Sequence, residues 1–218
     1  MTKKIGVVLS GCGFKDGAEI HEAVLTLLAL DQAGAEIVCM APNVDQTQVT
    51  NHITDEAQAE TRNVLVESAR IARGNIEDIA NVSANDLDAV VLPGGFGAAL
   101  NLSDFATKGP EAVVNADVKR LLEDIHNQKK PIGAICIAPA VVAATLGASK
   151  VKLTIGNDAG TADAINAHGA KHETCAVESI IVDEENKIVS TPAYMLGPDI
   201  RHVNSGIGLL ISEVMRMA

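Results

Sequence analysis

The chain has 218 residues, which is long enough for one large domain, and we expect residues 1–218 to form a single unit. The formal net charge is −11, and a surface of this sign repels phosphate groups, so we expect no nucleic acid and no anionic membrane as partners. Aromatic residues make up only 2 % of the chain, which argues against an aromatic platform for stacking bases or sugars.

The composition and the cysteine spacing indicate the cellular compartment in which the protein works. No apolar run approaches the ~18 residues that a membrane helix needs, and the run at residues 5–9 is too short for the core of a signal peptide. There is no C-x-x-C spacing, which argues against a zinc knuckle or a thioredoxin motif among Cys12, Cys39, Cys136 and Cys175. Because free thiols are usual in reducing compartments, we predict a cytoplasmic protein.

The first third of the chain alternates between strand and helix signals. Residues 4–9 form a continuous apolar run rich in β-branched residues, which predicts a buried parallel strand. Residues 18–33 have the length and composition of a helix, and Gly34 is a typical residue for its end. Residues 36–40 predict a second strand, and the polar, helix-prone residues 55–73 predict a helix at the rim.

The middle of the chain continues this alternation. Residues 87–92 predict a third strand, which ends in the sequence PGGFGAA. Residues 111–128 predict a helix, because their apolar side chains recur at helical spacing on one face. Residues 132–135 predict a fourth strand, and an apolar helix follows over residues 141–146.

The last third of the chain predicts shorter elements. We expect strands at 151–155, 172–182 and 187–191, a hairpin turn at 183–186, and helices at 161–168 and 206–217. Strands alternate with helices throughout, which is typical of a doubly wound α/β fold with a mostly parallel sheet and helices on both faces.

In such sheets, ligands bind beyond the carboxyl ends of the strands. Three strands end in residues of chemical interest: the first in SGCG, the third in PGGFG and the fourth in Cys136. Because the carboxyl ends of parallel strands lie on one side of a sheet, we expect these three segments to meet.

Cys136 stands at the joint between a strand and a helix, where a sharp turn can expose a side chain against a helix N-terminus. A helix N-terminus lowers the pKa of a thiol, so we expect a thiolate at neutral pH and a nucleophilic role. The alternative is a small apolar core residue, which we prefer for Cys39 and Cys175. Cys12 lies in a glycine loop at the same edge, and we leave open whether it lines the site.

Two further features accompany this cysteine. Gly94 and Gly95 follow a strand, where their backbone N–H groups are free to approach a ligand closely, although a tight turn without a ligand is the alternative. Glu22 lies on an otherwise apolar helix. A buried carboxylate next to a thiol would have a raised pKa and could carry protons, whereas an exposed position on the helix would give it no such role.

Other kinds of site are not supported. The pair Gly11 and Gly13 suggests a dinucleotide fingerprint, but the third glycine is replaced by Asp16. His168, His172 and Cys175 span a predicted helix end and a strand, which is a poor arrangement for a metal. We therefore expect no metal and no cofactor.

Long segments of the chain resemble a known family. The segments VVLSGCGFKDGAEIHEAV, NHITDEAQAETRNVLVESARI, VLPGGFGAALNLS, PIGAICIAPA, LTIGND and STPAYML together resemble the ElbB-type glyoxalases, within the PfpI-like, class I glutamine amidotransferase-like superfamily. The resemblance covers essentially the whole chain and implies one such domain over residues 1–218. It also implies a flavodoxin-like sheet, a nucleophile-elbow cysteine and a homodimer.

The resemblance also implies roles for single residues. Cys136 matches the elbow cysteine, Glu22 matches the family glutamate, and the N–H groups of Gly95 and Ile137 match the oxyanion donors, next to Gly94. Cys12 matches a loop cysteine to which we assign no role.

The chain departs from the superfamily in its histidines. There is no H-x-E near the C-terminus, and isoleucine replaces histidine both directly after the cysteine, at Ile137, and on the next strand, at Ile155. Glutaminase and peptidase chemistry therefore lack a base. The candidates for a second proton carrier are Asp16, His21 and Tyr194.

These observations lead to two functional hypotheses. The first is a glyoxalase that needs neither glutathione nor a cofactor. It would convert a small α-oxoaldehyde, glyoxal or methylglyoxal, to glycolate or lactate through a hemithioacetal on Cys136. Deglycase activity would be a related reaction. The second is a non-enzymatic, chaperone-like or redox-sensing dimer linked to isoprenoid biosynthesis, with Cys136 as the oxidised thiol.

Overall fold

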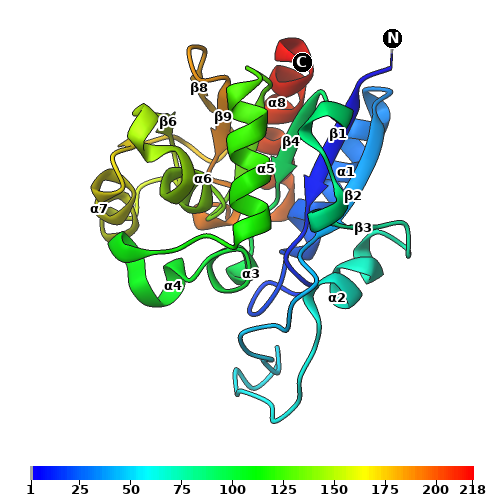
Figure 1. The fold of residues 1–218 in the computed structure, drawn as a ribbon. Coiled ribbons are helices and arrows are strands. Elements are labelled where there is room, and N and C mark those ends of the chain that lie inside the picture. The colour runs from blue at the N-terminus through cyan, green and yellow to red at the C-terminus, as the bar shows by residue number, and fades with distance from the viewer. Residues whose placement is uncertain (1) are drawn as a thin grey trace.

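The computed structural model describes residues 2–218 and contains a central sheet of seven strands (Figure 1). The strands are β1 (Lys4–Val8), β2 (Glu36–Ala41), β3 (Glu77–Asp78), β4 (Ala89–Leu92), β5 (Ile132–Ile135), β8 (Ile181–Asp183) and β9 (Ile188–Thr191). Their order is β3-β2-β1-β4-β5-β9-β8, and every pair is parallel except the β8–β9 hairpin. The predicted α/β fold with a mostly parallel sheet is confirmed.

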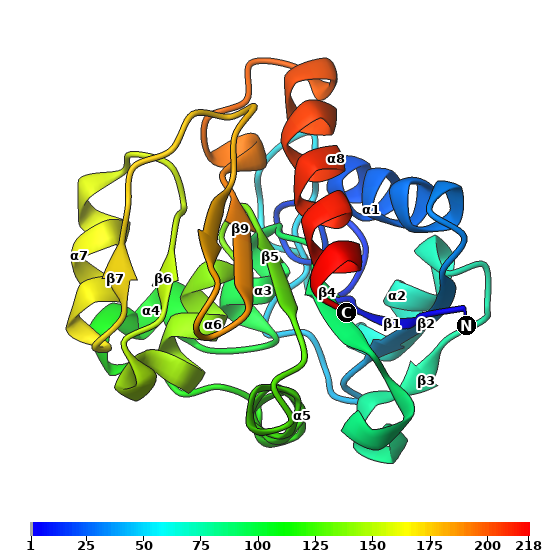
Figure 2. The same cartoon turned by 90° about the horizontal axis from the view of Figure 1, so that it is seen from above.

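Helices cover both faces of this sheet. They are α1 (Ile20–Gln32), α2 (Val64–Ile71), α3 (Phe96–Leu100), α4 (Phe105–Lys108), α5 (Ala116–Asn127), α6 (Pro139–Leu146), α7 (Ala159–Ala167) and α8 (Ile200–Met217). Short 3-10 turns lie at Ile79–Asn81 (η1), Ala84–Asp86 (η2), Gly109–Glu111 (η3), Gly147–Ser149 (η4) and Ala193–Met195 (η5). Helices α1 and α8 lie side by side on one face, and α5 lies on the other (Figure 2).

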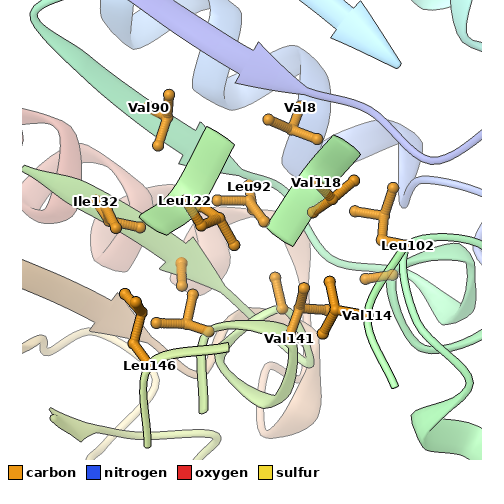
Figure 3. Close-up of a cluster of buried hydrophobic side chains, with 14 of the residues drawn as sticks. Val8, Val90, Leu92, Leu102, Val114, Val118, Leu122, Ile132, Val141 and Leu146 are labelled. Atoms are coloured by element: carbon orange, nitrogen blue, oxygen red, sulfur yellow. The ribbon is translucent and has the colours of Figure 1, made fainter. Parts of the chain in front are cut away.

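The strands are apolar on both sides because both sides are buried. On β4, Val90 and Leu92 face the core under α5 and α6, whereas Val91 faces the core under α1 and α8. Figure 3 shows the first of these cores, where Val118 and Leu122 of α5 pack against the strands. This two-sided burial explains the continuous apolar runs that predicted the strands.

The sheet brings the three predicted segments together. Strands β1, β4 and β5 are direct neighbours, with Val7 in register with Val91 and Val91 in register with Gly133. The loops that follow these strands therefore emerge next to one another at the same edge of the sheet.

One predicted helix is much shorter than expected. Residues 55–73 were expected to be helical, but α2 begins only at Val64, where the side chain of Asn63 accepts a hydrogen bond from Val66 N (3.1 Å). The preceding residues pair with the segment before them: Gln58 N donates to Val49 O (2.8 Å). Long-range backbone pairing thus replaces the i to i−4 pattern, and residues 42–63 extend beyond the carboxyl edge of the sheet (Figure 1).

The strand predictions in the last third are also wrong in part. The expected strands at 151–155 and 172–182 reduce to β6 (Lys152–Leu153) and β7 (Lys171–His172), which form a separate parallel pair, and to β8. The segment before β8 is held by a tertiary contact, because Thr191 Oγ1 donates to Ser179 O (2.8 Å). Within residues 2–218, no helix is long and apolar enough to cross a membrane.

Candidate active site

Cys136 occupies a strained turn between β5 and α6. Its φ angle is 62°, in the left-handed region that residues other than glycine rarely adopt. The turn is held because Cys136 N donates to Thr191 O (2.9 Å) and because Pro139 opens α6. The sharp strand-to-helix joint predicted for this thiol is therefore present.

Glu22 lies behind this cysteine. It belongs to the first turn of α1 and is fully buried, with an exposed fraction of 0 %. One carboxyl oxygen accepts a hydrogen bond from Gly94 N (3.0 Å), and the other accepts one from Tyr194 N (3.1 Å). The same carboxyl group lies beside the thiol of Cys136, and the two groups influence each other's pKa. Glu22 thus joins the segments that follow β4, β5 and β9.

Burial controls the charge of this pair. It raises the pKa of Glu22 from its ordinary 4.5 to about 8, so the carboxyl group is mostly protonated at neutral pH. Burial also raises the pKa of the Cys136 thiol well above its usual value, and the negative charge of an ionised Glu22 raises it further. The N–H groups of Gly95 and Ile137 act in the opposite direction but have a smaller effect on this pKa.

The expectation of a Cys136 thiolate at neutral pH is therefore wrong. The N–H groups of Gly95 and Ile137 lower the pKa of the thiol, but withdrawal from water and the neighbouring carboxyl group outweigh them. The nucleophile needs a proton acceptor, and Glu22 is the carboxyl group that contacts it.

The two glycines after β4 are required by close packing. A methyl group on Gly94 would collide with the Cβ of Cys136 and would lie 2.7 Å from the carboxyl group of Glu22. Gly95 has a φ of 95°, and a side chain there would collide with Gly17 and Glu19. The backbone can approach the thiol only because both positions are glycine.

A cavity of about 780 Å³ opens in front of the thiol. Its lining is mostly apolar, with a polar side formed by Glu19, His21 and Tyr194, and Thr161 also lines it. On that side, His21 Nδ1 and the Tyr194 hydroxyl are hydrogen-bonded at 2.8 Å. The remaining lining residues are Phe14, Gly95, Phe96, Ala99, Phe105, Ala106, Cys136, Ile137 and Met195.

The structure brings most of the predicted site residues together. Cys136, Gly95, Ile137, His21 and Tyr194 line the cavity. Glu22 and Gly94 lie directly behind the thiol, and the carboxyl group of Glu22 contacts it.

Two candidates lie elsewhere. The carboxylate of Asp16 is turned away from the cavity and accepts a hydrogen bond from Thr50 N (2.7 Å), so it holds the 42–63 segment. Cys12 lies on the side of α2, next to Glu67 and Arg70, and burial raises its pKa. Because these side chains point to the 42–63 segment and to α2, neither lines the cavity, although both belong to the loop after β1.

The lining also contains residues that were not predicted. Phe96 and Ala99 come from α3, Phe105 and Ala106 come from α4, and Phe14 comes from the loop after β1. The short helices α3 and α4 were missed because they lie in a glycine-rich and a polar segment without a repeating apolar pattern. Phe96 directly follows the glycine pair, and this position could have indicated that it lies at the site.

The three residues weighed as metal ligands do not form a metal site. The ring of His172 accepts a hydrogen bond from Ile155 N (3.2 Å), and the ring of His168 bonds to Gly109 O (3.0 Å). In the part of the chain that the structure describes, no three His, Cys, Asp or Glu side chains gather in a way that could hold a metal ion.

Comparisons with known proteins agree with this fold. Residues 8–195 match the DJ-1/PfpI family. The ES1 protein homolog, mitochondrial, of Rattus norvegicus is 45 % identical over 98 % of this chain and 84 % of the relative. The glutamine amidotransferase-like class 1 domain-containing protein 3, mitochondrial, of Homo sapiens is 46 % identical over 98 % of this chain and 83 % of the relative.

A solved structure extends the likeness to three dimensions. The crystal structure of an isoprenoid biosynthesis protein with amidotransferase-like domain from Ehrlichia chaffeensis superposes with a TM-score of 0.94. It is 40 % identical in sequence, and the match covers 99 % of both chains.

The names of the two mammalian relatives contradict the cytoplasmic location predicted from the sequence, because both are called mitochondrial. The prediction was based on free thiols and on the lack of a long apolar segment. Those features are shared by reducing compartments in general and do not single out the cytoplasm.

Proposed function

This chain belongs to the DJ-1/PfpI family, and from that premise we propose that it is a cofactor-independent glyoxalase with Cys136 as nucleophile and Glu22 as proton carrier. The observation that carries the proposal is the buried contact between the Glu22 carboxyl group and the Cys136 thiol at the base of a cavity. A carboxyl group with a pKa of about 8 can both accept and donate a proton at neutral pH.

The first step is addition of the thiol to the aldehyde. An ionised Glu22 accepts the proton of Cys136 as the sulfur bonds to the aldehyde carbon, and it then donates that proton to the new alkoxide oxygen. The N–H groups of Gly95 and Ile137, which lower the pKa of the thiol, stabilise this oxyanion. The product is a hemithioacetal.

The second step moves hydrogen between the two carbons of the substrate. Glu22 removes the proton from the sulfur-bearing carbon, which gives an enediol, and returns it to the neighbouring carbon. The former aldehyde carbon is oxidised to a thioester while the neighbouring carbonyl is reduced to an alcohol, so the reaction needs no external oxidant or reductant.

The third step is hydrolysis of the thioester. Water adds to the carbonyl carbon, the carbon–sulfur bond breaks, and the thiol regains its proton. We assign the activation of this water to the hydrogen-bonded pair of His21 and Tyr194, which lies on the polar side of the same cavity. This pair supplies the second proton carrier for which Asp16 was also considered. The same addition chemistry would serve a deglycase.

The test is glycolate formation from glyoxal without glutathione or metal. We expect wild-type protein to produce glycolate and Cys136→Ser to lose the activity by roughly 10³-fold or more. Cys12→Ser is the matched control, because this thiol does not line the cavity, and it should keep wild-type activity. Failure of the folded wild-type protein to convert any α-oxoaldehyde to its 2-hydroxy acid would refute the proposal.

The redox-sensing alternative has less support. Oxidation of a thiol follows its thiolate character and its exposure, and Cys136 has a raised pKa and an exposed fraction of 7 %. A peroxide-sensitive Cys136 in a protein that turns over no aldehyde would reverse this preference. The link to isoprenoid biosynthesis is supported by the name of the similar Ehrlichia chaffeensis protein.

We also propose that the protein is a homodimer, as the sequence resemblance implied. Ile20, Val24 and Leu28 form an apolar stripe on α1, and each is between 43 % and 48 % exposed. A charge in this stripe, as in Val24→Glu, should then shift the mass measured by light scattering from dimer to monomer. A wild-type protein that measures as a monomer would refute the dimer.

A further inference from the structure

All aromatic side chains of this protein lie around one cavity. The chain has three Phe, one Tyr and no Trp, and Phe14, Phe96, Phe105 and Tyr194 all line the cavity in front of Cys136. We propose, on the basis of the function proposed above, that the preferred substrate is an α-oxoaldehyde with an uncharged aromatic or bulky apolar group, and not glyoxal.

The four aromatic residues come from separate parts of the chain. They lie in the loop after β1, in α3, in α4 and in η5. Phe14 and Phe96 are connected through their backbones, since Phe96 N donates to Phe14 O (2.7 Å), yet their side chains remain 45 % and 54 % exposed. Large apolar side chains left accessible around a concave site are typical of ligand pockets. The low aromatic content of the sequence predicted no aromatic platform. The few aromatic residues nevertheless all lie around the cavity in front of the Cys136 thiol.

The size of the cavity favours a large substrate. Its volume is about 780 Å³, whereas a cavity of roughly 150 Å³ is enough to hold benzene. Glyoxal has two carbons and two oxygens and would leave most of this space, including its apolar walls, without a partner. An aryl group attached to the oxoaldehyde would fill the apolar part while the aldehyde carbon reaches Cys136.

The charges around the cavity define the rest of the substrate. Among the described residues that line it, none is Lys or Arg, and the polar side carries Glu19. A phosphate, diphosphate or carboxylate tail would find no cation there and would face a protein with a net charge of −11. The body of the substrate is therefore not anionic, and the mostly apolar lining favours an uncharged group over a cationic one.

Phenylglyoxal is the simplest probe of this class. Its aldehyde carbon bonds to the sulfur, the proton on that carbon moves to the neighbouring carbon, and water then cleaves the thioester. The balanced reaction converts phenylglyoxal and one water to mandelate, so mandelate formation measures it directly. Since phenylglyoxal also modifies arginine, the rate given by Cys136→Ser is subtracted.

The test compares kcat/KM for phenylglyoxal and glyoxal in the same protein. We expect phenylglyoxal to be preferred by roughly 10-fold or more, and we expect this ratio to fall several-fold in Phe96→Ala. Val66→Ala is the matched control, because Val66 is 61 % exposed on α2, away from the cavity, and it should keep the wild-type ratio. A ratio of one or below with glyoxal turnover intact, or an unchanged ratio in Phe96→Ala, would overturn the inference and leave the proposed function standing.

A second readout works without turnover. Mandelate and glycolate, the two products, are compared for protection of Cys136 against iodoacetamide. We expect mandelate to protect at roughly 10-fold lower concentration or less. If the protein turns over no aldehyde, the proposed glyoxalase fails, and equal protection by the two acids then overturns the assignment of an aromatic-binding cavity as well.

Discussion

The carboxyl group of Glu22 contacts the thiol of Cys136, and both side chains are withdrawn from solvent, with exposed fractions of 0 % and 7 %. One comes from the first turn of α1 and the other from the turn after β5. Because an ionised Glu22 raises the pKa of the thiol, the protonation of one group depends on that of the other.

Replacing Glu22 by Gln removes the proton carrier while keeping the size of the side chain. We expect glycolate formation to fall by roughly 10²–10⁴-fold. Cys136 should remain open to iodoacetamide, and the pH midpoint of its alkylation should fall, because the carboxylate that raises the thiol pKa is gone. Glu56→Gln, at an exposed position, is the control and should match wild type in both measurements. Wild-type glycolate formation by Glu22→Gln would refute the role of Glu22.

The same residue makes stability depend on pH. The pKa of Glu22 is about 8 in the folded protein, against an ordinary 4.5, so between these pH values the folded state binds more protons than the unfolded state. This group therefore stabilises the protein least at high pH: its contribution falls as pH rises from 4.5 to 8, by up to about 1.4 kcal/mol per pH unit.

Urea unfolding of wild type and Glu22→Gln at pH 5, 6, 7 and 8 measures this effect. The free energy of unfolding of wild type should fall relative to that of the variant as the pH increases. Glu56→Gln should follow wild type. A difference between wild type and Glu22→Gln that does not change with pH would show that Glu22 is ionised in the folded protein.

Gly94 leaves no room for a side chain. In Gly94→Ala the new methyl group collides with Cys136 and lies 2.9 Å from Ile135 O, so we expect a loss of roughly 1–3 kcal/mol in the free energy of unfolding, together with loss of activity. The matched control is Gly208→Ala in α8, where no atom lies within 4 Å of the added carbon. This variant should be more stable than wild type by about 0.5–1 kcal/mol, as judged by urea unfolding, with full activity. Full activity in Gly94→Ala would contradict the close approach of the Gly94 backbone to Cys136.

Tyr194 tests the hydrolysis step. Burial and the negative charges of Glu19 and Glu22 raise its pKa, so its hydroxyl stays protonated and available to His21. Tyr194→Phe keeps the ring but removes this hydroxyl, and we expect kcat to fall by roughly 10-fold or more. Intact-protein mass spectrometry should then detect a thioester on Cys136 that wild type does not accumulate. A slower reaction without this adduct would place Tyr194 in an earlier step.

Much of the site was predictable from the sequence because its signals are local. Apolar runs marked β1, β4 and β5, and parallel strands bring their carboxyl ends to one edge wherever the helices lie. The joint at Cys136 and the glycine pair after β4 are likewise properties of a few consecutive residues. Glu22 was noticeable as an acid on an apolar helix.

Only the tertiary structure decided the remaining features, because each depends on contacts between distant segments. Residues 55–62 pair with residues 46–51 instead of forming a helix, and Asp16 turns to Thr50 instead of the cavity. The pKa of Cys136 is set by burial and by Glu22, and these outweigh the opposite effect of the N–H groups of Gly95 and Ile137. The few aromatic side chains surround one cavity because four separate segments meet there, and neither composition nor spacing encodes such a meeting.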